Sequence, residues 1–525
     1  MKIQSRLPQK GSNLATLNFK HGESTRYRQS RGSSISIHEE APKYTVVTGA
    51  FPPGIYGAEV LVETVRDPEN PGRLAFLHWK DGRAEILHEI GYAGKILVPP
   101  DPTSSSFPDL SLPDRLLPCG EPAELVAEIS STISSFVKLL PHQLLIVAAF
   151  VVASWFPDCF EAAPYLWIVG PLGSGKTKLL MVLRCLCRRG LIVGDLRSGS
   201  IYKLIDAWNP TLLIDELEIG NSGPNNELLR MLRTGSVPGV PTVRNGNRFS
   251  TYGLKVVISR QPIGDAALAS RGLVISMLPT DTETLRLDQA AIQELEKKFQ
   301  PRLCMLRLKT YAAVKNHCVS PKDMRGLSPR VKQIGWALSA PLLGAAEYSS
   351  MLSKILREHD DEARIERSLE PEWLVAETLL AVCHEGIERD RLVSEILVGG
   401  VAAQINQRLK TQGEDIRLGA KKAGLVLKSL GVRTTRLGRM GRGLKLTPIL
   451  KRKIHEIAAQ LGIDRRAFVT LSGLEYGYGG APCTLCKKFG LTGGLRFVDI
   501  NKYRLRNHPS SDRIPLFDQK DGDEN

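Results

Sequence analysis

Residues 165–186, YLWIVGPLGSGKTKLLMVLRCL, join an apolar strand, a glycine-rich loop and a helical pattern in one run. The loop matches GxxxxGK(S/T) at every position, in the strand–loop–helix order that a phosphate-binding loop requires. Glycines let backbone N–H groups surround phosphate oxygens, and the start of the helix adds partial positive charge. The alternative is an ordinary glycine-rich turn. The pattern predicts nucleotide contacts, with Lys176 on the β- and γ-phosphates and Thr177 on Mg²⁺, from Gly170, Gly173, Ser174, Gly175, Lys176 and Thr177.

A second apolar strand, residues 211–216, TLLIDE, ends in two carboxylates. After a phosphate-binding loop, such a strand is typical of the acidic side of a nucleotide site. Asp215 is expected to hold Mg²⁺ through water, and Glu216 to polarise the water that attacks the γ-phosphate. The alternative is that both acids only face solvent.

The next apolar strand, residues 254–260, LKVVISR, also ends in polar side chains. A polar group there can lie between the two carboxylates and the γ-phosphate. We take Ser259 as the candidate for this role and Arg260 as its rival. Two arginines follow: Arg271 directly precedes an apolar strand, and Arg330 stands at the start of a helix in LSPRVKQIGWAL.

Together these motifs resemble the AAA+ ATPases, particularly helicase-like members carried by phages, plasmids and integrative elements. The resemblance covers roughly residues 160–345. It implies an α/β fold with a parallel sheet flanked by helices, ATP as substrate and Mg²⁺ as cofactor. It also implies that Arg271 is an arginine finger acting on a neighbour's ATP and that Arg330 is a second sensor; the alternative for each is a surface or ion-paired arginine. Ser259 departs from the family, in which asparagine is commoner at the first sensor.

Residues 241–250, PTVRNGNRFS, carry Asn-Gly between alternating residues, the strongest short-range signal of a β-hairpin. A hairpin just before the sensor strand resembles the pore hairpin of the minichromosome-maintenance and superfamily 3 helicases, which grips nucleic acid. The resemblance implies phosphate contacts from Arg244 and Arg248, which flank the tip. The alternative is a hairpin that only covers the edge of the sheet.

Most of the net positive charge lies toward the C-terminus. Between Val401 and Glu456 there are fourteen basic and three acidic residues, an excess of +11 against +15 for the whole chain. Two helical segments followed by the basic run RTTRLGRMGRGLKL resemble a winged helix-turn-helix, in which one helix enters the major groove and the wing contacts phosphates. The alternatives are a solvated basic face and a winged helix used for protein contacts. We predict DNA contacts from Lys421, Lys422, Arg436, Arg439 and Arg442.

Cys483 and Cys486 form a CxxC pattern in a glycine-rich turn. Such a pattern supplies half the ligands of a structural zinc site. Neither a second CxxC nor a paired histidine follows it, so we do not expect zinc here unless other segments supply two more ligands. The nine cysteines are otherwise scattered, which is typical of a reduced protein rather than of a disulfide framework.

Composition excludes other classes of protein. The chain is 42% hydrophobic and 24% charged, which are ordinary globular values. The longest apolar run, residues 144–156, is shorter than the roughly 17 residues needed to cross a bilayer. The N-terminal segment lacks the apolar core of a secretory signal. We expect a cytoplasmic protein outside the membrane, and the net charge of +15 favours a polyanionic partner.

With 525 residues the chain is too long for one compact core. We predict eight segments: a flexible basic tail (1–42), a β-rich N-terminal domain (43–100), a Pro/Ser linker (101–117), a helical lead-in (118–158), an AAA+ ATPase motor (159–345), a charged helical linker (346–372), a winged-helix DNA-binding domain (373–470) and a CxxC-containing tail (471–525).

The sequence therefore predicts an ATP-hydrolysing motor that acts on DNA as a homo-oligomer, most simply a hexameric ring. In this interpretation it is a replicative helicase or translocase of a mobile element or phage. The alternative is an ATP-controlled, DNA-bound initiator, transposition regulator or defence switch that unwinds no DNA.

Overall fold

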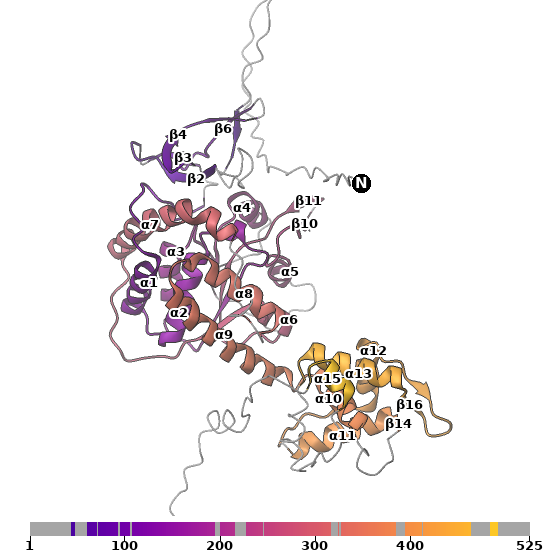
Figure 1. The fold of residues 1–525 in the computed structure, drawn as a ribbon. Helices are drawn as coiled ribbons and strands as arrows, with labels where there is room; N and C mark the ends of the chain where they lie inside the picture. The colour runs from indigo at the N-terminus through magenta and orange to yellow at the C-terminus, as the bar shows by residue number, and fades with distance from the viewer. Residues whose placement is uncertain are drawn as a thin grey trace, which may run out of the picture. The chain divides into compact units, whose positions relative to one another are not determined.

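The computed structural model describes residues 44–47, 60–70, 72–92, 95–104, 108–194, 200–215, 227–244, 246–316, 324, 327–384, 394–411, 413–463 and 483–491. The predicted basic tail, 1–42, lies outside these residues, as does most of the predicted tail at 471–525. The chain divides into two compact units, Met1–Arg357 and Glu358–Asn525 (Figure 1). The first contains a small β region and a parallel sheet covered by helices, and the second contains the basic C-terminal segment.

A five-stranded parallel sheet forms the centre of the first unit, in the order β13-β7-β12-β9-β8. Every residue of β7 and β12 is buried, because helices cover both faces of the sheet. This explains why these strands are continuous apolar runs rather than alternating ones. The strands are β7 (Tyr165–Val169), β8 (Leu191–Val193), β9 (Leu212–Ile214), β12 (Lys255–Ser259) and β13 (Gly272–Ser276).

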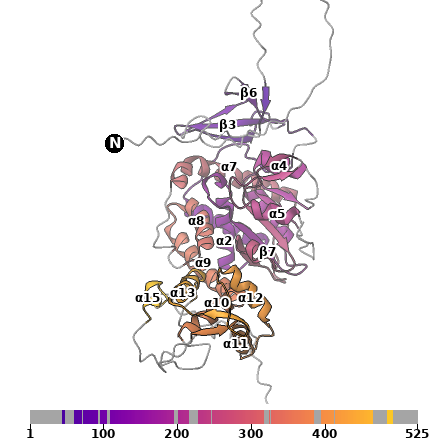
Figure 2. The ribbon, with the colours of Figure 1, turned by 90° about the vertical axis from the view of Figure 1, so that its right-hand side faces the viewer.

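Alternate residues of β7 enter different cores, as the pleat of a strand requires. Leu166 and Ile168 pack with α1, α2, α3, α7 and α8, whereas Tyr165 and Trp167 pack with α4, α5 and α6. Figure 2 shows α2 and α8 on one side of this unit and α4 and α5 on the other. The predicted α/β fold class is therefore confirmed. The helices are α1 (Pro122–Phe136), α2 (Pro141–Ala153), α3 (Lys176–Leu186), α4 (Ser200–Trp208), α5 (Glu227–Thr234), α6 (Ala266–Ala269), α7 (Gln289–Lys315) and α8 (Pro329–Ser339), with the short 3-10 helices η1 (Pro157–Cys159) and η2 (Ala340–Leu342).

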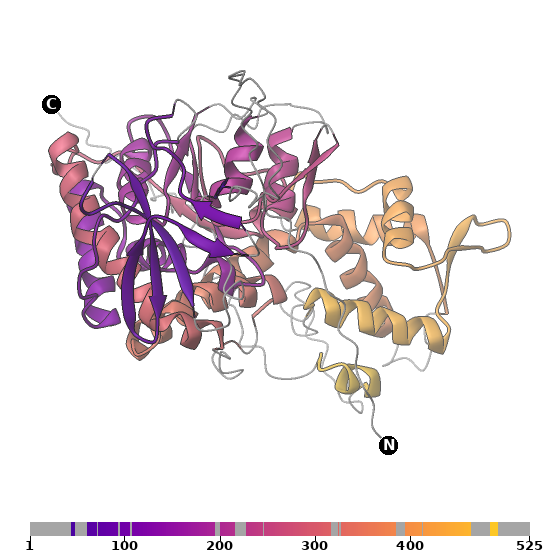
Figure 3. The same ribbon diagram turned by 90° about the horizontal axis from the view of Figure 1, so that it is seen from above.

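Six short strands precede the large sheet and form the predicted β region (Figure 3). One sheet is antiparallel, in the order β2-β3-β4, and the other has the order β1-β6-β5. One side of β2 and β3 packs, through Leu61, Val65 and Leu77, against the helices that cover the large sheet. The strands are β1 (Tyr44–Val46), β2 (Leu61–Arg66), β3 (Leu74–Lys80), β4 (Arg83–Leu87), β5 (Ile90–Tyr92) and β6 (Lys95–Val98).

A buried ion-pair cluster joins the β region to these helices. The Glu63 carboxylate on β2 accepts hydrogen bonds from Arg188 (2.8 Å) and Arg307 (2.7 Å), and Arg189 lies 3.4 Å away. Arg307 also donates to Asp158 at 2.8 and 3.0 Å. Burial alone would raise the pKa of Glu63, but the guanidinium groups overcome this and lower it to about 2. The cluster is therefore ionised at neutral pH.

Part of the segment assigned to a Pro/Ser linker is packed against the first unit. Leu110 and Leu112 are buried in the core under α4 and α5. The Ser111 hydroxyl donates a hydrogen bond of 2.6 Å to Glu296 on α7. These contacts fix the described residues 108–112 on the surface of the helices, so this part of the segment is not a free spacer.

The second unit has the topology of a winged helix. A three-stranded sheet in the order β14-β16-β15 follows α10, and the helices α11 and α12 lie between β14 and β15 in the sequence. Leu418, Ala423 and Leu427 are buried in its core. The elements are α9 (Ala346–Arg367), which crosses the boundary between the units, α10 (Pro371–His384), β14 (Glu395–Leu397), α11 (Val398–Thr411), α12 (Ala420–Ser429), β15 (Thr435–Arg436), β16 (Arg442–Lys445), α13 (Pro448–Leu461) and α15 (Thr484–Lys488).

No single helix in the described part of the chain is both long and apolar enough for a membrane span. The helices α1 and α2 reach that length and composition only when counted together, and they are bent by 118° relative to each other.

Candidate nucleotide site and nucleic-acid interface

The glycine-rich loop connects the carboxyl end of β7 to the start of α3. Gly175 has φ +85° and occupies the position just before the helix, where a side chain would be strained. A Cβ atom on Gly170 would lie 2.1 Å from the carbonyl oxygen of Met277, so only glycine fits there. The backbone N–H of Gly170 donates to the Ser259 carbonyl oxygen at 3.3 Å. These constraints explain why the loop sequence tolerates no larger residue at these two positions.

A cavity of about 270 Å³ lies against this loop. It brings together side chains that the sequence predicted for one site: Lys176 and Thr177 from α3, Asp215 from the end of β9, and Ser259 from the end of β12. β12 pairs with both β7 and β9, so the carboxyl ends of three neighbouring strands meet here. Gly173, Ser174, Gly175 and the rival Arg260 also line the cavity. Glu216 lies outside the described residues.

The Lys176 ammonium group lies over the loop. It donates hydrogen bonds to the carbonyl oxygens of Gly170 (2.7 Å) and Pro171 (2.6 Å) and lies 3.4 Å from the Ser174 hydroxyl. Its positive charge is thus held at the wall of the cavity. The Ser259 hydroxyl, by contrast, donates to the Gln261 carbonyl oxygen at 2.6 Å.

The donor set fits a magnesium nucleotide. A threonine hydroxyl and a carboxylate, Thr177 and Asp215, are hard oxygen ligands of the type that Mg²⁺ prefers, usually with several waters retained. The glycines leave backbone N–H groups open to phosphate oxygens, since no Cβ atom stands in front of them at Gly173 or Gly175. The residues present therefore suit Mg²⁺ and a triphosphate.

Arg271 and Arg330 do not line this cavity. Arg271 precedes β13, and its carbonyl oxygen accepts a hydrogen bond of 3.1 Å from the N–H of Tyr165, the first residue of β7. It therefore lies at the amino edge of the sheet, roughly 13 Å along the strand from the loop. Its side chain donates to the Ser236 hydroxyl at 3.1 Å. Burial and, to a lesser degree, the positive charge of Arg330 lower the pKa of Arg271, so the two arginines are near each other.

The predicted hairpin is confirmed. β10 (Thr242–Arg244) pairs antiparallel with β11 (Asn247–Phe249), and Arg244 stands opposite Asn247. The Arg244 guanidinium group packs over the Tyr202 ring on α4, 5.1 Å from its centre, so this side chain is half-buried. Arg248 and its cross-strand partner Val243 are exposed.

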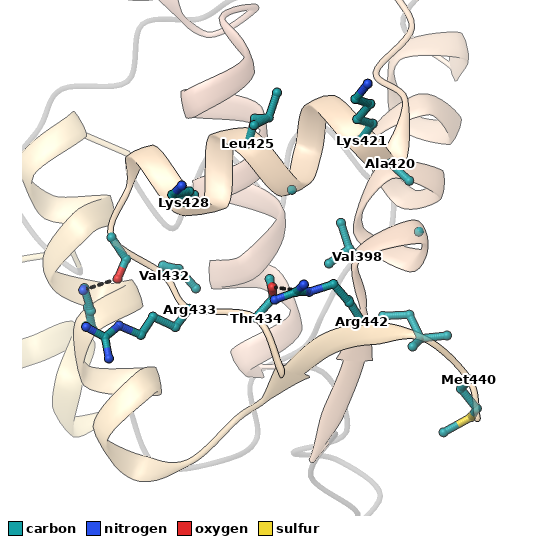
Figure 4. Close-up of a pocket in the computed structure, with 15 residues that line it drawn as sticks. Val398, Ala420, Lys421, Leu425, Lys428, Val432, Arg433, Thr434, Met440 and Arg442 are labelled. Atoms are coloured by element: carbon teal, nitrogen blue, oxygen red, sulfur yellow. Dashed lines mark hydrogen bonds between the residues drawn. The ribbon is translucent and has the colours of Figure 1, made fainter. Parts of the chain in front are cut away.

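A basic groove of about 1140 Å³ lies between α12 and the wing in the second unit. Figure 4 shows Lys421 and Lys428 along α12 on one side of the groove, and Arg433 and Arg442 on the other. These four side chains and that of Lys453 are exposed, and none of the residues that line the groove is acidic. We name this feature the basic groove.

The sequence analysis predicted only some of the basic residues that line the basic groove. Lys421 and Arg442 line the basic groove, whereas Lys422, Arg436 and Arg439 are exposed but do not line it. The missed residues could be found only in part: Lys428 follows Lys421 by seven positions and so shares its helix face. The lining residues that the sequence analysis missed are Lys428, Arg433 and Lys453. Nothing in the sequence places Arg433 or Lys453 beside Lys421.

The CxxC pattern has histidine neighbours from other segments. His384 at the end of α10 and His455 on α13 lie beside Cys483 and Cys486, although 71 positions separate the two histidines. The condition set for a complete zinc site, two further ligands from other segments, is therefore met, because long-range packing supplies them where the local sequence does not.

The loop between β7 and α3, with acidic and polar residues on the two strands that follow in the sheet, defines an α/β fold with a phosphate-binding loop at the carboxyl edge of a parallel sheet. No model of a protein family matches the chain, and no curated protein sequence is significantly similar to it. Several solved structures are distantly similar. The C-terminal region of NrS-1 has 11% identity and a TM-score of 0.32, over 74% of this chain and 97% of that one. The MCM homologue from Methanopyrus kandleri has 12% identity and a TM-score of 0.28, over 58% and 78%. The JCV helicase has 15% identity and a TM-score of 0.19, over 45% and 74%.

Proposed function

We propose that this chain is an ATP-hydrolysing motor that acts on DNA, as a replicative helicase or translocase of a phage or mobile element. The observation that carries the proposal is the convergence of Lys176, Thr177, Asp215 and Ser259 on one cavity. These residues come from separate segments of the chain, so their meeting is not a consequence of one local motif. A pocket with a phosphate-binding loop, a metal-type carboxylate and a polar sensor is built for hydrolysis of a nucleoside triphosphate.

Each residue has a distinct role in this proposal. Lys176 binds the β- and γ-phosphates, and Thr177 and Asp215 hold Mg²⁺, Asp215 through water. When bound, Mg²⁺ neutralises charge that develops on the phosphates. Ser259 orients the γ-phosphate by a hydrogen bond, for which its hydroxyl turns from the Gln261 carbonyl oxygen. Glu216, the residue after Asp215, orients the attacking water.

Arg271 and Arg330 support a ring of identical subunits. Both lie toward the edge of the sheet opposite the chain's own cavity, so Arg271 can reach a γ-phosphate only in a neighbouring subunit. A head-to-tail arrangement that repeats such an interface closes into a ring. We propose a hexamer, with Arg271 as the arginine finger and Arg330 acting at the same interface.

The basic groove is the proposed DNA contact of the second unit. In a winged helix the helix corresponding to α12 enters the major groove and the wing follows the phosphates. Leu425 and Met440 are 61% and 68% exposed at the groove, where apolar side chains can contact bases or sugars. In the first unit, Arg248 at the exposed hairpin is the proposed second contact, and Arg244 contributes if it leaves the Tyr202 ring.

ATP turnover and binding test the motor directly. Glu216→Gln should lower turnover by roughly 10²- to 10⁴-fold, because the attacking water loses its base, while ATP binding is retained. Lys176→Ala should lose ATP binding as well. Lys203→Ala, which removes an exposed lysine of α4 that does not line the cavity, should match the unaltered chain. Near-normal turnover in Glu216→Gln would remove Glu216 from this role.

Strand displacement separates the motor from the alternative. A helicase should displace a labelled strand in proportion to the ATP that it consumes, and both should stop in Glu216→Gln. Slow turnover that is stimulated by DNA without displacement or movement along DNA would favour the DNA-bound switch, initiator or regulator instead.

A further inference from the structure

Four side chains from three segments of the second unit converge on one point. They are His384 from the end of α10, His455 from α13, and Cys483 and Cys486 at the start of α15. Their donor atoms all lie within 4.8 Å of one another. His455 and Cys486 are buried, and His384 and Cys483 are half-buried. Two of these residues are the CxxC pattern, which the nucleotide site and the basic groove do not use.

Three of the six separations between the donor atoms match the edges of a tetrahedral zinc site, and the other three lie within 4.8 Å. With Zn–N near 2.05 Å and Zn–S near 2.3 Å, a tetrahedron places two nitrogens about 3.3 Å apart and a nitrogen and a sulfur about 3.6 Å apart. The two Nε2 atoms are 3.4 Å apart, Cys483 Sγ lies 3.6 Å from the His455 ring, and Cys486 Sγ lies 3.3 Å from the His384 ring. Each pair is within about 0.3 Å of the ideal edge.

The histidines are oriented as metal ligands are. The Nδ1 atom of His384 is 2.7 Å from the Leu380 carbonyl oxygen, and that of His455 is 2.7 Å from the Lys451 carbonyl oxygen. Because a carbonyl only accepts, each Nδ1 carries a proton, and in the neutral form of each ring the lone pair of Nε2 then faces the cysteines. Backbone carbonyls commonly fix the tautomer of zinc-bound histidine in this way.

We propose that His384, His455, Cys483 and Cys486 bind one Zn²⁺ ion. Two thiolates and two imidazoles are a common donor set of structural zinc, and four protein ligands leave no position open for a substrate. The site is therefore structural. It goes beyond the motor proposed above and does not depend on it.

The ion fastens α15 to α10 and α13. A helix of five residues, Thr484–Lys488, has little stability of its own. Its apolar contacts are few: Cys486 and Leu491 are buried in the core of the second unit, with Phe489 packed against it. Zinc therefore fixes the segment that follows the winged helix onto the side of α13, the helix that supplies Lys453 to the basic groove.

Metal content of the intact protein tests the site. The full chain, purified without chelator, should contain about one zinc per chain by mass spectrometry of metals. Replacement of zinc by Co²⁺ should give the intense visible absorption of a tetrahedral ion together with a thiolate-to-cobalt charge-transfer band. A chain that holds no zinc, and that gives neither feature with Co²⁺ after reduction of its thiols, would overturn the proposal in favour of S–H···N hydrogen bonds alone.

Substitutions assign the ligands. Cys486→Ser and His455→Ala should each reduce bound zinc to about a tenth or less, because the three ligands that remain hold zinc far more weakly than four. Cys159→Ser, which alters a half-buried thiol of the first unit, is the matched control and should keep one zinc per chain. Retention of zinc in Cys486→Ser would show that the metal is bound elsewhere. The Co²⁺ spectrum of the unaltered chain decides the question if a variant fails to fold.

Discussion

The buried arginine cluster of the first unit and the basic groove of the second place their arginines in opposite surroundings. In the first unit, Arg188, Arg189 and Arg307 are buried around Glu63, with Asp158 as a second acid. In the second unit, the basic residues of the basic groove are exposed and no acid lines the groove. A buried arginine without its acid is costly, whereas an exposed one keeps its hydration and remains available to a phosphate.

This difference shows when a local excess of basic residues indicates a surface that binds a ligand. The excess of +11 between Val401 and Glu456 indicates a ligand surface because few acids are available to pair with it. Arg271 and Arg330 are a third case: they are partly exposed at an edge of the sheet, where a neighbouring subunit could complete their surroundings. The three groups should respond differently to substitution.

Arg271→Ala should have the largest effect. An arginine finger stabilises transition-state charge and is worth roughly 10³- to 10⁵-fold in rate, so ATP turnover should fall by that factor. If the finger and the pocket belong to different subunits, as we propose, a mixture of Arg271→Ala with Lys176→Ala should recover activity. With free exchange, about one interface in four combines an intact pocket with an intact finger.

The mixing experiment also excludes a purely structural role for Arg271. Its side chain contacts Ser236 and the Arg233 carbonyl oxygen, so its loss could disturb the fold of its own subunit. A misfolded subunit would not complement Lys176→Ala. Turnover of the mixture should be measured at several ratios after subunit exchange is shown; the absence of recovery at every ratio would mean that the finger does not act between subunits.

Glu63→Gln should destabilise the first unit by about 3–5 kcal/mol, because three buried guanidinium groups lose the carboxylate between them. Chemical denaturation measures the free energy of unfolding. Glu85→Gln, an exposed change on β4 in the same β region, should shift it by less than about 0.5 kcal/mol. Equal effects of the two substitutions would show that the cluster contributes nothing to stability.

The stability of the first unit at acid pH should also depend on the ion-pair cluster around Glu63. The pKa of Glu63 is lowered from 4.5 to about 2 in the folded chain. A carboxyl group with a depressed folded pKa stabilises the fold above its unfolded pKa and loses this contribution as the pH falls toward the folded value. The difference between the unaltered chain and Glu63→Gln should therefore be constant above about pH 5 and shrink between pH 4.5 and pH 2. Unfolding measurements at each pH would show no such change if Glu63 were not ionised.

The sequence predicted the features that contiguous residues encode. The loop at Gly170–Thr177 and the hairpin around Gly246 are local, because the glycine positions and flanking strands specify each by themselves. The apolar strands also indicated the α/β class. The order of the strands in the sheet, which brings Asp215 and Ser259 to the loop, is not encoded by any contiguous stretch of residues.

Long-range packing explains what the sequence did not reveal. The Glu63 cluster joins residues up to 244 positions apart, and no local pattern marks its members as partners. The histidines beside the CxxC pattern are 71 positions apart, and each is an ordinary residue of its own helix. Lys453 of the basic groove comes from the helix after the wing for the same reason.

Substitutions in the basic groove should have the smallest and most graded effect. Lys421→Gln with Arg442→Gln removes two charges from opposite walls, so DNA binding should weaken without loss of stability or of basal ATP turnover. If each side chain neutralises one phosphate, the slope of log K against log salt should become less steep by about 1.8, since each phosphate contact contributes about 0.9. Lys410→Gln with Arg417→Gln, which removes two exposed charges of the same unit outside the groove, controls for net charge. Fluorescence anisotropy over a range of salt concentrations measures this slope for both double variants. An equal change of slope in the two would mean that DNA binding depends on the total charge of the unit and not on the basic groove.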